Sequence, residues 1–88
     1  MDYCVITFDS THGAIYAQKR LEGLLPFQVM PVLREISAGC GIALRLAPDH
    51  LEAARAALAA SELKAEEYAF YAVSGSGSSL RAELLPLP

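Results

Sequence analysis

Cys40 has the clearest chemical setting of any residue in this chain, and it lies between two apolar runs with Gly39 and Gly41 on either side. Glycines can adopt positive φ, and they let backbone N–H groups converge without Cβ obstruction on whatever the sulfur carries. A nearby guanidinium favours thiolate over thiol. Because Arg34 and Arg45 flank Cys40 in the sequence, we expect a nucleophilic cysteine.

The alternative is a structural role, in which Cys40 is a small apolar residue that closes a glycine-rich turn. Buried structural cysteine is common. A Gly-Cys-Gly tripeptide is a weak motif, so the local sequence leaves both interpretations open. The other cysteine, Cys4, alternates with Ile6 and Phe8 in an apolar stretch. That pattern favours a buried position for Cys4 in the core.

Composition limits the classes of protein to consider. The 88 residues fit one domain, and 53% hydrophobic with 19% charged residues indicates a globular chain. The formal charge of −3 and the scattered basic residues argue against nucleic acid as a partner. The sequence has no signal-peptide pattern and no apolar run of membrane-spanning length. We therefore expect no membrane partner and a cytoplasmic protein, where thiols stay reduced.

The hydrophobic pattern predicts six elements in the order β-α-β-β-α-β. They are strand 3–8, helix 11–24, strand 27–32, strand 42–46, a helix that begins at Pro48, and strand 67–73. This order predicts an α+β, ferredoxin-like two-layer sandwich with a four-stranded antiparallel sheet and both helices on one face. Pro31 places its strand at an edge or breaks it. The other sheet face would be left to solvent or a partner.

The domain is predicted to cover residues 1–74. Residues 75–88 begin with a run of alternating glycine and serine and end in a short stretch rich in leucine and proline. Such a composition is typical of a flexible linker followed by a flexible tail.

A second polar group is expected where the first helix begins, because Ser10 and Thr11 suit an N-cap and His12 falls in the first turn. N–H groups at a helix N-terminus can receive an anion. His12 could equally be an exposed residue near the cap. His12, Cys40 and Cys4 are too few well-spaced ligands for a closed zinc site, so we expect no metal. Phosphate-loop and nucleophile-elbow motifs are absent, and we expect no cofactor.

These residues together resemble a known family. The resemblance rests on Ser10–His12 after a strand ending in Phe8, on Arg34–Ser37, on Cys40–Gly41 and on Ala43–Arg45. This combination resembles a family of small bacterial domains described as selenium/sulfur carrier protein-like, over about residues 3–71. The resemblance implies a cytoplasmic protein whose single cysteine carries sulfane sulfur or reduced selenium.

The resemblance also implies roles for individual residues. It places the carrier thiol on Cys40 and a backbone cradle on its two neighbouring glycines. The supporting groups that we expect are Arg34, Ser37, Gly39, Gly41, Arg45, Ser10, Thr11 and His12. The implied partners are donor and acceptor proteins, and we expect a stoichiometric carrier rather than an enzyme that turns over.

Cys40 belongs to no C-x-x-C pair, which argues against thioredoxin-type dithiol chemistry. The rival hypothesis is a non-catalytic binding or assembly module with a structural cysteine. In that case a homodimer could form through the free sheet face or the tail, and the fold alone cannot choose between the two.

Overall fold

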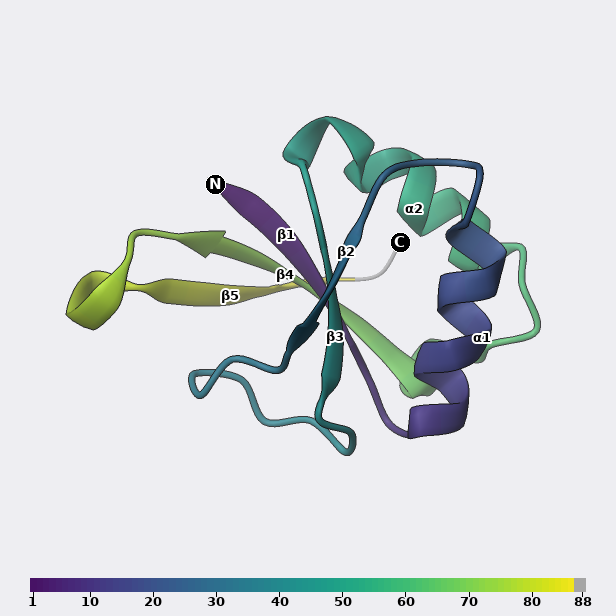
Figure 1. Ribbon diagram of the computed structural model, residues 1–88, viewed down its shortest axis with the longest axis horizontal. Coiled ribbons are helices and arrows are strands. Elements are labelled where there is room, and N and C mark those ends of the chain that lie inside the picture. The colour runs from purple at the N-terminus through teal and green to yellow at the C-terminus, as the bar shows by residue number, and fades with distance from the viewer. Residues whose placement is uncertain (87–88) are drawn as a thin grey trace.

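The computed structural model describes residues 1–86 and is a mixed α+β fold (Figure 1). Two α-helices pack against a five-stranded antiparallel sheet with the strand order β2-β3-β1-β4-β5. The strands are β1 (Tyr3–Phe8), β2 (Gln28–Pro31), β3 (Ile42–Leu46), β4 (Tyr68–Ser74) and β5 (Arg81–Leu85). The α-helices are α1 (Thr11–Leu21) and α2 (Leu51–Ala59). Short 3-10 turns cover Pro48–His50, Ala65–Glu67 and Gly77–Ser79.

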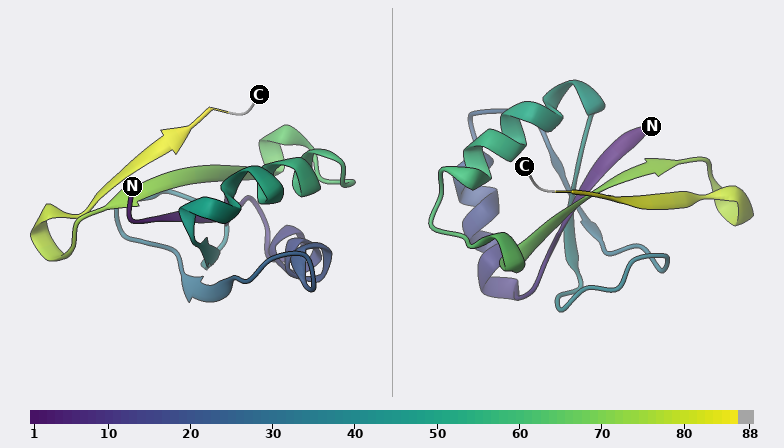
Figure 2. Two further views of the ribbon diagram at one scale, coloured as in Figure 1. Left: turned by 90° about the horizontal axis from the view of Figure 1, so that it is seen from above. Right: turned by 180° about the vertical axis from the view of Figure 1, so that it is seen from behind.

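The main core lies between the sheet and the two helices, which both cover the same face (Figures 1 and 2). Alternation along β1 directs Cys4, Ile6 and Phe8 into this layer, and all three are buried. Each fully buried Leu, Ile or Phe side chain contributes roughly 1.5–3 kcal/mol relative to exposure. The helices contribute mostly small residues, Ala14, Ala17 and Ala54 with Leu21 and Leu58, so they can approach the sheet closely.

Helix α1 begins as the sequence predicts. Ser10 is its N-cap, and the Ser10 hydroxyl accepts a hydrogen bond from the Gly13 N–H at 3.1 Å. The helix ends at Leu21 because Glu22 leaves helical geometry at φ −59° and ψ 128°. The predicted range 11–24 was therefore too long at its C-terminal end. Strands β1 and β3 have the predicted bounds, and β2 lies at a sheet edge as Pro31 indicates.

The sheet face opposite the helices is partly covered, which differs from the expectation of an open face. Val5, Ala43 and Val73 are buried there with Ile36 from the β2–β3 connection. Val32, Leu33 and Leu80 pack against the same cluster. The chain thus uses its own loop to cover apolar side chains that alternation directs away from the helices.

The sheet has five strands where the sequence predicted four, because residues 81–85 pair with β4 instead of forming a flexible tail. Leu85 lies opposite Phe70 and Arg81 opposite Ser74. The connection turns at Gly75, whose φ of 80° suits glycine and whose N–H donates to Asp2 Oδ2 at 2.9 Å. Residues 87–88 of the predicted tail lie outside the described residues.

Candidate functional site

Cys40 ends the connection between β2 and β3, just before β3 begins at Ile42. The connection is closed by two backbone hydrogen bonds, Val32 N–H to Gly41 C=O and Ile36 N–H to Leu33 C=O, both at 3.0 Å. Cys40 is only 6% exposed and belongs to the helix-side core. The Cys40 side chain thus turns inward just before β3, and its thiol is largely enclosed.

The Cys40 sulfur nevertheless has polar neighbours. The backbone N–H of Ile42 donates to Sγ at 3.3 Å. The Thr11 hydroxyl lies 3.6 Å from the same sulfur, in a contact where either group can donate. One N–H donor from the start of β3 and one hydroxyl from the first turn of α1, which can donate or accept, therefore meet at the sulfur. Such donors suit a sulfur atom that carries negative charge. The thiol can also donate to the Ile42 carbonyl, 3.9 Å away.

The two glycines beside Cys40 act differently from our expectation, since neither has positive φ. Gly39 packs directly against the backbone carbonyl of Asp9, so closely that an added Cβ would overlap the Asp9 oxygen. Gly41 has open space around its Cα. The Ile42 N–H, rather than the N–H groups of the glycines, reaches the sulfur. Glycine is thus required at position 39 because the Asp9 carbonyl lies too close for a side chain, and not because the backbone has a positive φ.

Ser37 and Arg34 are exposed side chains of the connection that holds Cys40. Ser37, Ala38 and Gly39 line a pocket of about 190 Å³ that also includes Asp9 and several β4 residues. Glu66 and Glu67 contribute further acidic groups to this pocket. Within residues 1–86 no hydrogen bond joins Arg34 or Ser37 to the Cys40 sulfur. Cys40 itself does not line this pocket, and the carboxylates that do would oppose the binding of an anion there.

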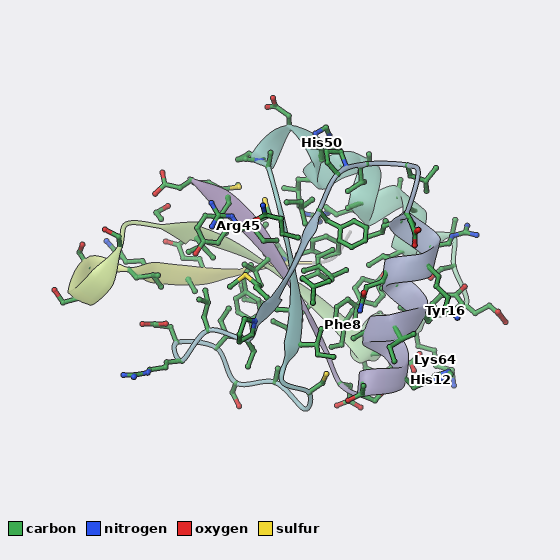
Figure 3. The ribbon with its side chains drawn as sticks, viewed as in Figure 1. Phe8, His12, Tyr16, Arg45, His50 and Lys64 are labelled. Carbon is green, nitrogen blue, oxygen red and sulfur yellow. The ribbon has the colours of Figure 1, made fainter. Side chains whose placement is uncertain are left out.

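Arg45 lies at the other end of the sheet from Cys40. Its guanidinium stacks over the Tyr3 ring, 3.9 Å from the centroid. Arg45 is five residues beyond Cys40, and extended backbone advances about 3.3 Å per residue, so up to roughly 16 Å of chain separates the two. Figure 3 shows Arg45 near the start of β1 and His12 near the start of α1, well apart. The structure thus separates Arg45 from the thiol that it was expected to support.

Of the three residues expected at the start of α1, the structure brings one to the sulfur. Thr11 contacts Cys40, whereas Ser10 is engaged in capping the helix through Gly13. His12 is exposed on the first turn of α1 (Figure 3). Ser10 therefore acts on the site indirectly, by fixing the turn that presents Thr11.

Cys4 has a different environment, fully buried on β1. Its thiol donates to the Met1 thioether sulfur at 3.1 Å. Burial raises the pKa of the Cys4 thiol above its ordinary value of 9.0, and the nearby N-terminal ammonium opposes that effect to a smaller extent. Cys4 is therefore held as the neutral thiol near neutral pH. The two cysteines are both free.

Across residues 1–86, no three His, Cys, Asp or Glu side chains gather in a way that could hold a metal ion. In the same residues neither helix combines the length and apolar character required to cross a membrane.

Sequence reasoning missed Ile42 and Asp9. The Ile42 N–H is a backbone group, and its contact with Cys40 follows from the turn that starts β3. Asp9 is not among the predicted site residues, yet its carbonyl fixes the position of Gly39. The paired glycines were the available signal for a close backbone approach, but the sequence does not say which segment approaches.

Comparison with known proteins gives one match. The family model described as "Putative Se/S carrier protein-like" matches residues 3–69, from the first residue of β1 into β4. The matched segment includes Cys40 with its flanking glycines, and it excludes β5. No curated protein and no solved structure matches the chain. Because the family model matches most of the 88 residues, the chain belongs to the Se/S carrier protein-like family.

Proposed function

We propose that this protein carries one sulfur or selenium atom on Cys40 and relays it from a donor protein to an acceptor. The observation that supports this most directly is the pair of polar groups at the sulfur, the Ile42 N–H at 3.3 Å and the Thr11 hydroxyl at 3.6 Å. A purely structural cysteine in an apolar core has no need of either group. Membership of the family supports the same assignment.

Loading is a thiol exchange in which electrons and atoms balance without an added oxidant. The Cys40 thiolate attacks the outer sulfur of a donor persulfide, R–S–SH, and a new S–S bond forms to Cys40. The donor S–S bond breaks, and the donor leaves as its thiolate, R–S⁻. Unloading is the reverse, in which an acceptor nucleophile takes the outer sulfur and Cys40 leaves as thiolate. A donor of the form R–S–SeH would deliver selenium by the same steps.

The chain's own residues have distinct parts in this proposal. The Ile42 N–H donates to the inner sulfur, and the Thr11 hydroxyl can donate to it in both the thiolate and the persulfide states. Gly39, fixed against Asp9, sets the path of the loop that turns Cys40 inward. Since Cys40 is 6% exposed, a donor reaches the sulfur when the loop opens locally. Burial between exchanges would protect the bound atom from other thiols.

We further propose that the first four strands and the two helices are a ferredoxin-like unit to which β5 has been added. The order β2-β3-β1-β4 within the sheet supports this proposal. In this arrangement the β2–β3 connection and the β1–α1 junction lie at one end of the sheet. That end is where Thr11 meets Cys40.

A binding or assembly module with a structural cysteine is the second candidate, and the low exposure of Cys40 favours it. Incubation with inorganic polysulfide, followed by intact-mass measurement, separates the two. We expect one added sulfur in the wild type and in Cys4→Ser, and none in Cys40→Ser. A folded wild-type protein that gains no sulfur, or gains it equally in Cys40→Ser, would overturn the carrier proposal.

A further inference from the structure

The two edges of the sheet differ in how readily they accept another strand. The β2 edge has four residues, and Pro31 removes one N–H donor from it. The β5 edge, Arg81–Leu85, has no proline, and no strand within residues 1–86 pairs with its outer side. Unprotected edge strands are templates for pairing with another chain. Leu84 on this edge is 62% exposed, a large apolar side chain without cover.

Side chains on β5 alternate between the two sheet faces. Ala82 and Leu84 lie opposite Val73 and Tyr71 of β4 and share their face, away from the helices. Leu80 precedes the strand in an extended conformation and packs on that same face. Arg81 and Glu83 are exposed on the other face. The edge therefore carries an apolar row on one side and two opposite charges on the other.

We propose that two copies of this chain pair through β5 as antiparallel strands about a two-fold axis at Ala82. In that register Arg81 of each copy lies opposite Glu83 of the other, which gives two cross-strand ion pairs. Leu80 of each copy likewise lies opposite Leu84 of the other on the second face. Opposite charges and apolar pairs directly across antiparallel strands are both stabilising. The pairing covers Leu84 and joins the two sheets into one.

Charge selects this register over its neighbours. A two-fold axis at Glu83 would set the two Glu83 carboxylates directly opposite each other, which is destabilising. An axis at Leu84 would set Glu83 opposite Leu85 and form no ion pair. Pro86 ends the pairing on one side because it has no N–H donor. Of these registers, only the axis at Ala82 pairs both charges and sets the exposed Leu84 opposite the half-buried Leu80.

Sedimentation velocity over a range of protein concentrations tests the proposal. We expect the wild type to self-associate reversibly. Glu83→Arg and Arg81→Glu should each weaken the dimer by on the order of tenfold, since both ion pairs become like-charge pairs. Glu52→Arg, the same charge change on the exposed face of α2, should leave self-association unchanged.

Two rescues make the register itself testable. The double variant Arg81→Glu/Glu83→Arg should dimerise like the wild type. An equimolar mixture of the two single variants should form heterodimers, because every charge then faces its opposite. Circular dichroism confirms that each variant is folded. A wild type that stays monomeric at all concentrations, single variants that dimerise normally, or folded variants that neither rescue restores would each overturn the proposal.

Discussion

Cys4 and Cys40 are both buried cysteines on the helix side of one small sheet, yet their surroundings differ in kind. Cys4 is fully enclosed, and among the described residues its side chain hydrogen-bonds to the Met1 thioether alone. Cys40 meets a backbone N–H and a hydroxyl, and its neighbours Gly39 and Gly41 are exposed. Burial is therefore common to both cysteines. What differs is the set of groups that touch each sulfur and the segment that holds it.

The largest expected contrast is in labelling by iodoacetamide under native conditions. Cys4 lies in a central strand, so it should react only through global unfolding, on the order of 10³-fold or more slowly than an unfolded thiol. Cys40 lies at the end of a connection and should react through local opening, at a much higher rate. Peptide mass mapping over time distinguishes the two sites. If Cys4 and Cys40 are labelled at equal rates, and both rates change in parallel with the free energy of global unfolding, the two cysteines do not differ in accessibility.

Gly39→Ala tests the packing that holds Cys40. The new Cβ would overlap the Asp9 carbonyl, so the loop must shift, at a cost of about 1–3 kcal/mol. We expect urea denaturation to show that loss and Cys40 labelling to accelerate. Gly41→Ala is the matched control, because nothing lies within 4 Å of its added Cβ. Similar stability losses in both variants would contradict the special role of position 39.

The pH dependence of stability tests the environment of Cys4. Its pKa is raised in the folded state, so the folded protein retains the proton after the unfolded chain begins to lose it near 9.0. This contribution is complete below that pH and is lost as the pH rises toward the folded pKa. The slope is at most about 1.4 kcal/mol per pH unit. Urea denaturation of Cys4→Ala over the pH range above about 9 should show a shallower decline in stability than the wild type.

Thr11→Val should have the smallest effect. It removes the hydroxyl near the Cys40 sulfur while nearly preserving shape. A single neutral hydrogen bond contributes roughly 0.5–1.5 kcal/mol, so polysulfide loading of Cys40 should slow about 2-fold to 10-fold. Thr11→Ser keeps the hydroxyl and should load normally. If the Thr11→Val and Thr11→Ser variants are loaded by polysulfide at equal rates, the Thr11 hydroxyl has no part in the exchange.

Much of the fold could be predicted from periodicity because most elements are short and local. Strands β1 and β3 have the predicted bounds, and the family resemblance is confirmed. β5 was missed because the glycine and serine run before it resembles a linker, while its pairing with β4 depends on tertiary contacts. Whether residues 1–74 fold without it stays a prediction, testable by truncation after Ser74.

The candidate site was harder to predict than the fold. Sequence placed Cys40 at the start of a strand, but it could not say that the side chain turns inward. Arg45 is near Cys40 in number and distant in space because extended backbone separates residues quickly. Thr11 is remote in sequence and near in space because β1 pairs antiparallel with β3, which sets the end of β1 beside the start of β3. Sequence distance was therefore a poor guide to which polar groups reach the sulfur.

The contact between Gly39 and the Asp9 carbonyl has a consequence for how this family can vary. Two segments that are thirty positions apart in the chain share one van der Waals boundary, so neither can change size by itself. Relatives that keep the path from the first strand into the first helix should keep glycine at the position before the cysteine. Where another residue stands there, that path should have changed with it, and an alignment of relatives would record the two changes as a correlated pair.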